Sequence, residues 1–176
     1  MSEWPSPEIF PDRRRPHRLP RCEYRKLLQP VFFACCTSHR RPILLQRGLP
    51  AALKILLDES ARHHGSEIIA ATLMPDHLHV IACVVRDGGD VLSFFSEFKR
   101  SAALAAARRG LDNLWQRDFW DRHTRNHHDL TRCFTYVLWN AVEERLCDRP
   151  EDWPHTTFRG WPSSLVDRTG EGPEGR

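Results

Sequence analysis

The chain has 176 residues, of which 40% are hydrophobic and 28% are charged, a balance typical of a soluble globular protein. This length suits one domain with a real core, and no apolar run approaches the roughly 20 residues that a membrane span needs. The net charge of +3 is too small to indicate a nucleic-acid partner by itself. The first thirty residues are rich in proline and arginine, so we expect no secretory signal and an intracellular protein.

Residues 1–27 combine five prolines with a cluster of basic side chains, which predicts an extended, weakly ordered N-terminal arm. Such an arm can contact phosphates, and it can equally be a solvated tail, so the charge cluster leaves both interpretations open. We expect a single folded domain over residues 28–150 and a C-terminal tail over residues 151–176. The basic residues of the arm are Arg13, Arg14, Arg15, Arg18, Arg21, Arg25 and Lys26.

The middle of the chain alternates between patterns typical of strands and helices. Pro30–Thr37 is a short run of strand-forming residues, and Ser66–Leu73 is a second one. Between them, Gly48–Gly65 has the apolar spacing of a helix face, with Gly65 as its C-terminal stop. After a Met-Pro-Asp turn, the segment up to Val85 predicts a third strand, antiparallel to the second.

The second half of the chain predicts two longer helices separated by an irregular connector. Val91–Gly110 is rich in alanine, and Leu130–Cys147 carries an unbroken apolar stripe. Asp129 is the expected N-cap of this last helix, and Pro150 is expected to enforce its end. The connector, Leu111–His128, is dense in Trp, Arg and His. The order strand, helix, strand, strand, helix, helix predicts an α+β fold with a ferredoxin-like (RRM-like) antiparallel sheet and packed helices in a single domain.

The six cysteines contain no Cys-x-x-Cys pair and no spacing typical of zinc ligands. We interpret them as reduced thiols, several of which lie in the core. The cysteines are Cys22, Cys35, Cys36, Cys83, Cys133 and Cys147.

Two histidines open the third predicted strand, in the stretch LMPDHLHVIACVV (Leu73–Val85). Side chains alternate between the faces of a strand, so His77 and His79 share one face while Leu78 and Val80 point to the other. Two neighbouring imidazoles can share a metal ion. Because the pattern His-x-His also arises by chance, a third ligand and a nucleophile are needed before a metal site is indicated.

The chain has only two tyrosines, Tyr24 and Tyr136. Tyr136 lies on the last predicted helix, one residue off its apolar stripe, and Asn140 follows one turn later on the same edge. This pair can be a boundary tyrosine beside a solvated asparagine. It can also supply a phenol and a neutral oxygen donor to the two histidines, and the combination of strand and helix favours this second interpretation. Glu144 continues the edge by one more turn and could assist the metal or a proton transfer.

Three segments of the chain resemble the REP-associated tyrosine transposases, which belong to the single-tyrosine HUH endonucleases together with the transposases of small bacterial insertion sequences. LMPDHLHVI looks like the metal-site strand of this family. YVLWNAVEERLCDRPEDWPHTTF looks like its nucleophile helix and downstream tail, and LWQRDFWDRHTRNHHDL is the third segment. In order and spacing the similarity covers residues 25 to 160, approximately.

The resemblance implies that Tyr136 is the nucleophile and that His77, His79 and Asn140 are the metal ligands. Such a site would suit Mg²⁺ or Mn²⁺, although imidazoles also suit softer metals and the sequence does not choose between them. Three neutral ligands would leave the full charge of the ion to polarise a phosphodiester. The product would be a 5′-phosphotyrosine bond and a free 3′-hydroxyl. In one departure from the family, Ala141 follows Asn140 where proline is usual. This change puts the local helix shape in doubt and leaves every chemical group present.

The connector and the second helix carry the candidate DNA contacts. Aromatic side chains can stack on unpaired bases while cationic side chains meet phosphates, the usual arrangement on single strands. The tryptophans can equally close the core, and the charged side chains can simply be solvated. The candidates are Lys99, Arg100, Trp115, Arg117, Phe119, Trp120, Arg122 and Arg125. We interpret the adjacent pairs His63–His64 and His127–His128 as surface residues.

We therefore expect a transposase-type, metal-dependent single-strand DNA endonuclease and strand transferase. The resemblance implies that its partner is a palindromic repeat folded as hairpin DNA, cut beside a short tetranucleotide. We expect a cytoplasmic, nucleoid-associated monomer or homodimer. A replication or conjugation initiator would need further domains, for which 176 residues leave no room. The other alternative is a domesticated single-stranded nucleic-acid-binding protein without turnover, which would have no use for all four site residues.

Overall fold

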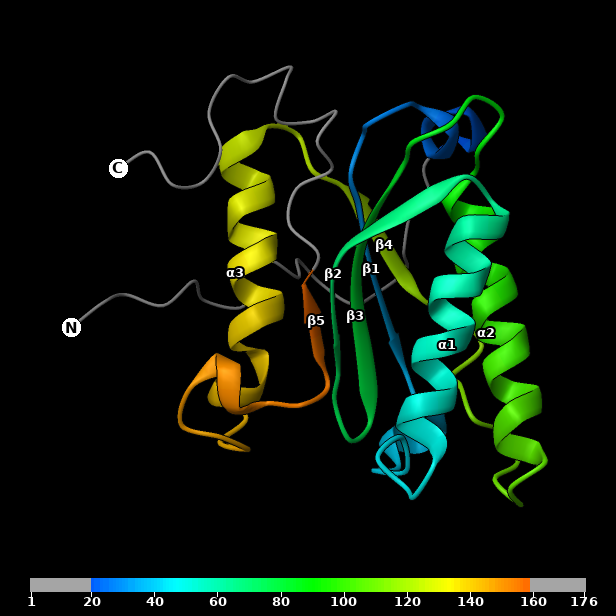
Figure 1. Cartoon of the computed structure of the whole chain (residues 1–176), viewed down its shortest axis with the longest axis vertical. Helices are drawn as coiled ribbons and strands as arrows, with labels where there is room; N and C mark the ends of the chain where they lie inside the picture. Colours follow the sequence, from blue (N-terminus) through cyan, green and yellow to red (C-terminus); the bar gives the residue numbers. More distant parts are fainter. Residues whose placement is uncertain (1–19, 159–176) are drawn as a thin grey trace.

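Five antiparallel strands form one sheet in the order β4-β1-β3-β2-β5 in the computed structural model, which describes residues 20–158 (Figure 1). Most of the predicted basic arm and the end of the predicted tail therefore lie outside the described residues, and the predicted domain limits remain expectations. The strands are β1 (Val31–Cys36), β2 (Ser66–Leu73), β3 (His77–Val84), β4 (Trp120–His123) and β5 (Thr156–Phe158).

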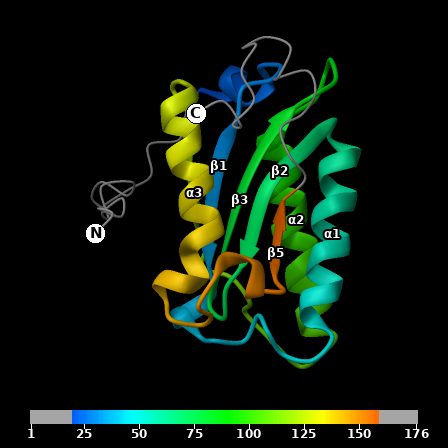
Figure 2. The ribbon, with the colours of Figure 1, turned by 60° about the vertical axis from the view of Figure 1, so that its left-hand side comes forward.

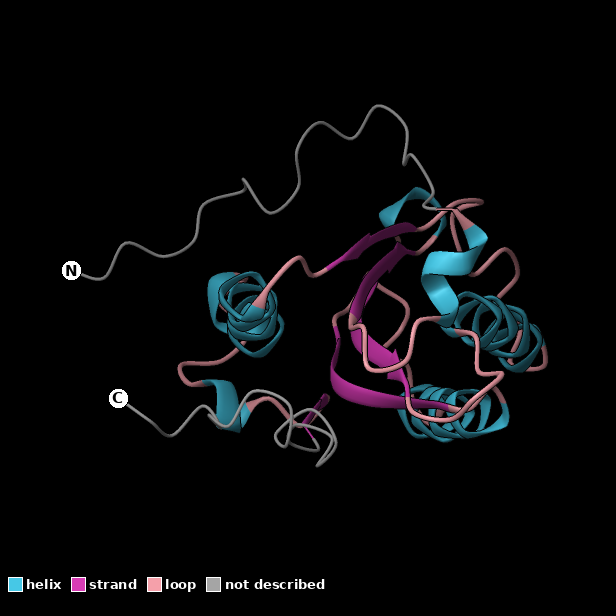
Figure 3. Cartoon of the chain, turned by 90° about the horizontal axis from the view of Figure 1, so that it is seen from above, coloured by secondary structure: helices cyan, strands magenta, loops and turns pink. Residues whose placement is uncertain are grey.

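Three α-helices pack on the two faces of this sheet. α1 (Leu49–His63) and α2 (Val91–Ala107) lie side by side on one face, and α3 (His127–Glu143) lies on the other (Figures 1, 2 and 3). The first four strands with α1 and α2 have the ferredoxin-like order, so the predicted fold class is confirmed. Short 3₁₀-helices cover Arg21–Arg25, Ser38–Arg40 and Pro150–Asp152. Across residues 20–158, no helix has both the length and the apolar character needed to cross a membrane.

The alternation of side chains along the strands builds a separate apolar cluster on each face of the sheet. In β1, Phe32 belongs to the cluster under α3 and Phe33 to the cluster under α1 and α2, and both rings are fully buried. Phe33 stacks on Phe95 of α2 with 4.5 Å between the ring centroids. Burying a side chain of this size contributes about 1.5 to 3 kcal/mol, so these clusters hold the helices on the sheet.

The two ends of α3 differ from the sequence prediction. Asn126, rather than Asp129, is the N-cap, because its side-chain oxygen accepts a hydrogen bond from the backbone N–H of Asp129 at 2.8 Å. The helix ends at Glu143, and Pro150 lies well beyond that end. Arg145 takes a left-handed conformation (φ 58°), which lets its own N–H and that of Leu146 donate to the carbonyls of Val142 and Ala141 in the last turn. The Pro150 stop was therefore wrong, because a left-handed residue ends the helix first.

Two short edge strands, β4 and β5, were not predicted from the sequence. β4 lies inside the connector that was expected to be irregular, and it pairs with β1 through residues such as Asp121, opposite Phe33. β5 pairs with β2, for example Thr157 opposite Ala71. Both strands are too short and too polar to show an alternating pattern, so the neighbouring strand rather than their own composition makes them extended.

Three of the cysteines are buried parts of this core, as expected for reduced thiols. Burial raises the pKa of Cys35 and of Cys83 to about 12 and the pKa of Cys133 to about 11. These thiols therefore stay protonated at neutral pH and behave as small apolar side chains.

Candidate metal and nucleophile site

His77 and His79 begin β3 and point toward α3. Both side chains are buried, and their ring centroids lie 4.7 Å apart. Leu78 and Val80, between and beside them in sequence, belong to the apolar cluster on the opposite face. Because alternate side chains point to opposite faces, this strand presents two imidazoles toward α3 and apolar side chains toward the core on its other face.

The residues across from His79 on the neighbouring strands are small. Ala34 of β1 and Thr72 of β2 are its direct partners in the sheet, and Cys36 of β1 stands opposite His77. Cross-strand partners in an antiparallel sheet lie on the same face. Short side chains around the histidines thus leave the space above them to α3.

Tyr136 and Asn140 reach this space from α3. The Asn140 side-chain oxygen lies 3.1 Å from Nε2 of His77, and the Tyr136 hydroxyl lies 3.5 Å from Nε2 of His79. Asn140 is buried although it is polar, while Tyr136 is half-buried at the edge of the α3 cluster. All four residues predicted from the sequence therefore lie together, contributed by two elements that are far apart in the chain.

Asp76 holds His77 and is itself paired with Arg40, and sequence reasoning missed both of these residues. One carboxylate oxygen of Asp76 lies 2.6 Å from Nδ1 of His77, and the other accepts a hydrogen bond from Arg40 at 3.1 Å. Asp76 belongs to the Met-Pro-Asp turn, so the turn alone can explain an aspartate at this position. The only sequence signal for a role in the site was its place next to the first histidine, because a ligating histidine usually gives its second N–H to a carboxylate or carbonyl.

The charge state of the site follows from its burial. Burial, with smaller effects from His77 and Arg40, lowers the pKa of His79 well below its usual value, so this imidazole is neutral at pH 7. Burial, with a smaller contribution from the carboxylate of Glu143, also raises the pKa of Tyr136 to about 12. A hydrogen bond from Asn140 opposes this shift. The phenol is thus protonated at neutral pH unless a cation binds beside it.

The three predicted ligands fit a divalent ion. A carboxylate can only accept, so His77 donates to Asp76 from Nδ1, and in the neutral tautomer with that proton Nε2 carries the lone pair. This Nε2 faces the amide oxygen of Asn140 at 3.1 Å, and two such atoms repel unless a proton or cation lies between them. In an octahedral shell with bonds of about 2.1 Å, neighbouring ligand atoms lie about 3.0 Å apart. The spacing between His77 and Asn140 therefore suits two neighbouring ligands of one divalent metal ion.

Two of the predicted DNA contacts, Lys99 and Trp115, have hydrogen-bond partners within the chain, and their role as DNA contacts stays a prediction. Lys99 of α2 donates hydrogen bonds to the backbone carbonyls of Gln116 and Asp118, at 3.1 and 3.3 Å. The indole N–H of Trp115 donates to the backbone carbonyl of Lys99 at 3.1 Å, and its ring packs near Phe98. These contacts fasten the connector to α2, on the face opposite Tyr136.

The remaining predicted DNA contacts lie under α3, on the opposite face of the sheet, or at the surface. Arg122 of β4 pairs with Asp129 at the start of α3, and Trp120 packs edge-to-face on Phe32 beneath α3. Phe119 is buried in the cluster on the opposite face. Arg100, Arg117 and Arg125 are exposed. Their role as DNA contacts remains a prediction.

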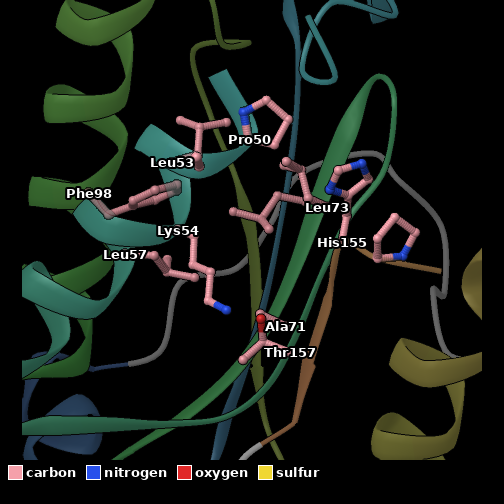
Figure 4. A pocket seen from close by; sticks show the side chains of 12 residues that line it. Pro50, Leu53, Lys54, Leu57, Ala71, Leu73, Phe98, His155 and Thr157 are labelled. Atoms are coloured by element: carbon pink, nitrogen blue, oxygen red, sulfur yellow. The ribbon is translucent and has the colours of Figure 1, made fainter. Parts of the chain in front are cut away.

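A pocket of about 300 Å³ lies on the other face of the sheet, between α1 and the β2–β5 edge (Figure 4). Its lining is mostly apolar, with Leu53, Leu57 and Phe98 on the helix side, and Lys54 and His155 among its polar members. The sheet separates this pocket from His77 and His79, which point toward α3. The pocket is therefore not part of the candidate site.

The chain is similar to known proteins over most of its length. The family described as Transposase IS200 like matches residues 29–125, a segment that holds β1 to β4 and both histidines of β3. The REP-associated tyrosine transposase of Escherichia coli K12 is 30% identical over 127 residues, covering 72% of this chain and 74% of the relative. The chain belongs to the REP-associated tyrosine transposases of the IS200-like family. α3, with Tyr136 and Asn140, follows the segment that the family description matches.

Two further proteins of this family are similar to the chain. A protein of Haemophilus influenzae Rd, described as a putative REP-associated tyrosine transposase, is 22% identical over 111 residues, covering 57% of this chain and 63% of its own length. The structure of a REP-associated tyrosine transposase bound to a REP hairpin superposes with a TM-score of 0.65 and 25% identity. That match covers 85% of this chain and 86% of the other, which confirms the α+β fold of the family.

Proposed function

We propose that the protein is a metal-dependent transposase that cuts single-stranded hairpin DNA through Tyr136 and transfers the strand. The observation that supports this most strongly is the meeting of four groups on facing elements. The Tyr136 hydroxyl lies 3.5 Å from Nε2 of His79, and His77 lies 3.1 Å from Asn140. A phenol beside three neutral ligand atoms is the arrangement that attack on a phosphodiester requires.

In the proposed cleavage, Tyr136 is the nucleophile. Its hydroxyl gives up a proton to solvent, and its oxygen forms a bond to the phosphorus of the scissile phosphodiester. The bond from phosphorus to the 3′ oxygen breaks, and that oxygen takes up a proton from solvent. The products are a 5′-phosphotyrosine and a free 3′-hydroxyl. Because the energy of the phosphodiester is kept in the tyrosine ester, a 3′-hydroxyl of another strand can reverse the step and complete a strand transfer.

His77, His79 and Asn140 are the proposed ligands of Mg²⁺ or Mn²⁺. When bound, the divalent ion would polarise the scissile phosphate and favour the phenolate form of Tyr136. Asp76 holds the proton of His77 on Nδ1 and so directs its Nε2 toward the ligand position. Burial keeps His79 neutral, which leaves one of its ring nitrogens with a lone pair for a metal.

The proposed substrate is a palindromic repeat folded as a hairpin. A structurally similar REP-associated tyrosine transposase has been solved bound to a REP hairpin, and this supports the same class of partner here. Arg100, Arg117 and Arg125 have exposed side chains that can meet phosphates. Lys99 and Trp115 would act mainly by holding the connector in place, since hydrogen bonds made by both residues join the connector to α2.

The test is a denaturing protein gel after incubation with end-labelled hairpins from the DNA that flanks the gene. We expect a covalent protein–DNA band with Mn²⁺, no band with a chelator, and no band for Tyr136→Phe. Tyr24→Phe is the matched control, because Tyr24 is the only other tyrosine in the sequence and its hydroxyl bonds the buried Asp121 at 2.5 Å. The Tyr24→Phe variant should keep the covalent band.

A different result would favour a DNA-binding protein without turnover. If the wild-type chain binds the hairpin tightly and binds Mn²⁺ but forms no covalent band under any metal condition, the nuclease function is excluded. A band that persists in Tyr136→Phe and is lost in Tyr24→Phe would assign the nucleophile to the other face of the sheet.

A further inference from the structure

A second group of metal-binding side chains lies at the end of α1, where it packs against α2. His63 is the last residue of α1, His64 is its C-cap, and Glu97 lies on α2. Both helices are on the face of the sheet opposite α3, as Figure 3 shows from above. This group is therefore separated by the sheet from Tyr136 and His79.

The two imidazoles bind the two oxygens of one carboxylate. Nε2 of His64 lies 2.9 Å from one oxygen of Glu97, and Nδ1 of His63 lies 3.2 Å from the other. The two rings are close together, with 4.9 Å between their centroids. One ligand atom from each residue lies within 4.8 Å of the other two, and no other group of three such residues is found in residues 20–158.

Two adjacent histidines can converge in this way because the helix ends between them. Neighbouring side chains on a continuing helix point in different directions and do not face each other. Here His64 has left the helical conformation, and Gly65 takes a left-handed one (φ 61°), so the chain turns at this point. A side chain at Gly65 would also approach Gly89 to 3.2 Å, which ties this turn to the start of α2.

The charges around the group favour a bound cation. The pKa of Glu97 is lowered by hydrogen bonds from both imidazoles, so the carboxylate is ionised at neutral pH. The C-terminal end of a helix carries a partial negative charge, and His63 and His64 stand at that end of α1. Arg86 also lies here, and its guanidinium is directed to the backbone carbonyl of Arg62. The His64 and Glu97 side chains are partly buried, with 23% and 28% of their surface exposed, while His63 is open to solvent.

We propose that His63, His64 and Glu97 form a binding site for a transition-metal ion of the Zn²⁺ class. Two imidazole nitrogens and one carboxylate are a common zinc donor set, and water from the open side can complete a tetrahedron. Imidazole nitrogens favour Zn²⁺ over Mg²⁺, and the ionised carboxylate of Glu97 adds a charged ligand to the two histidines. The bound ion joins the end of α1 to α2 and stabilises the helical layer without entering the cleavage reaction.

The experiment measures zinc bound to the full chain by equilibrium dialysis, and thermal unfolding with and without Zn²⁺. Because the histidines of β3 can also bind zinc, each measurement is made in the wild-type chain and in His77→Asn/His79→Asn. We expect the His77→Asn/His79→Asn chain still to bind zinc and to unfold at a higher temperature with it. Adding His63→Gln/His64→Asn, or Glu97→Gln alone, should remove both effects, because a ligand that binds only the folded state raises the unfolding temperature.

The matched control is His127→Gln/His128→Asn, which changes another adjacent pair of exposed histidines. This variant should bind as much zinc as its parent chain. In the wild-type background, loss of His63 and His64 should remove one zinc equivalent while leaving metal-dependent DNA cleavage unchanged. Equal zinc binding and equal thermal stabilisation after His63→Gln/His64→Asn would overturn the proposal, as would the absence of zinc binding in the His77→Asn/His79→Asn chain.

Discussion

The two faces of the sheet are made from the same strands but cover different kinds of surface. Toward α1 and α2, the buried residues of β1 and β3 are all apolar, and aromatic rings such as Phe33 fill the layer. Toward α3, β3 begins with His77 and His79 and only then continues with apolar Ile81 and Cys83. The α3 layer is thus apolar at one end and polar at the other.

This difference shows how one strand can carry both a core and a site. Because alternate side chains point to opposite faces, the two histidines of β3 interrupt only one of the two clusters. The larger cluster under α1 and α2 can hold the fold while the smaller one positions Tyr136 against His79. We therefore expect substitutions on the two faces to separate stability from cleavage.

The largest expected effect is on the face that only supports the fold. Phe33→Ala removes a fully buried ring that stacks on Phe95 and contacts Phe119. We expect the free energy of unfolding to fall by about 3 to 5 kcal/mol, because the surrounding side chains cannot close the cavity completely. Urea denaturation followed by circular dichroism measures this change.

Phe32→Leu and Phe33→Leu sharpen the comparison, since the two residues are adjacent and face opposite ways. Phe32 packs against the rings of His79 and Tyr136, with centroid distances of 5.4 and 6.3 Å. We expect Phe32→Leu to slow cleavage per folded molecule and Phe33→Leu to leave it unchanged, although both lower stability. Equal cleavage by the two variants would show that the packing beside His79 does not position it.

The next effect concerns the carboxylate that orients the first histidine. Asp76→Asn replaces the charged acceptor 2.6 Å from Nδ1 of His77 with a neutral amide. We expect Mn²⁺ affinity to fall by about 10- to 100-fold, the usual cost of losing such a partner of a metal ligand. Calorimetric titration with Mn²⁺ measures this loss, and cleavage should recover at saturating Mn²⁺.

Asp87→Asn is the control for this substitution, because Asp87 is an exposed acid in the turn after β3. It should leave Mn²⁺ affinity unchanged. If Asp76→Asn also leaves the affinity unchanged, Asp76 serves the turn and its pair with Arg40 rather than the histidine.

The sequence was sufficient to predict which site residues share a face of the same strand or helix, because this depends only on local periodicity. The strand period places His77 and His79 on one face, and the helix period places Asn140 one turn after Tyr136. That the strand and the helix face each other came from the family resemblance, because no local pattern reports a contact between segments so far apart. The structure adds the distances, 3.1 and 3.5 Å, that make the four groups one site.

The parts that the sequence did not predict depend on neighbours in space. β4 is extended because it lies along β1, although its residues Trp120–His123 include three that are charged or ionisable. α3 ends at Glu143 because Arg145 adopts a left-handed conformation. An arginine in the sequence does not indicate that its backbone will be left-handed. The pair His63–His64 was interpreted as surface residues, because nothing in the sequence indicates that Glu97 lies beside it.

The smallest expected effect comes from the acidic end of α3. The carboxylate of Glu143 raises the pKa of Tyr136, although burial is the larger cause. Glu143→Gln should lower that pKa and shift the pH–rate profile of cleavage to lower pH, with a gain of less than about tenfold at a fixed pH, since one pKa unit corresponds to tenfold. Glu144→Gln should shift the profile less, because its effect on the pKa of Tyr136 is smaller.

The same substitution tests the charge of Glu143 through stability. Desolvation and the carboxylate of Glu144 raise the pKa of Glu143 from 4.5 to about 7 in the folded chain. A carboxyl whose pKa is higher in the folded state than in the unfolded state stabilises the fold below pH 4.5, and this contribution is lost as the pH rises through about 7. Glu143→Gln should therefore raise the unfolding temperature relative to wild type at pH 8 and lose that advantage at pH 4.5. A constant difference between the two chains across this range would mean that the pKa of Glu143 is the same in the folded and the unfolded chain.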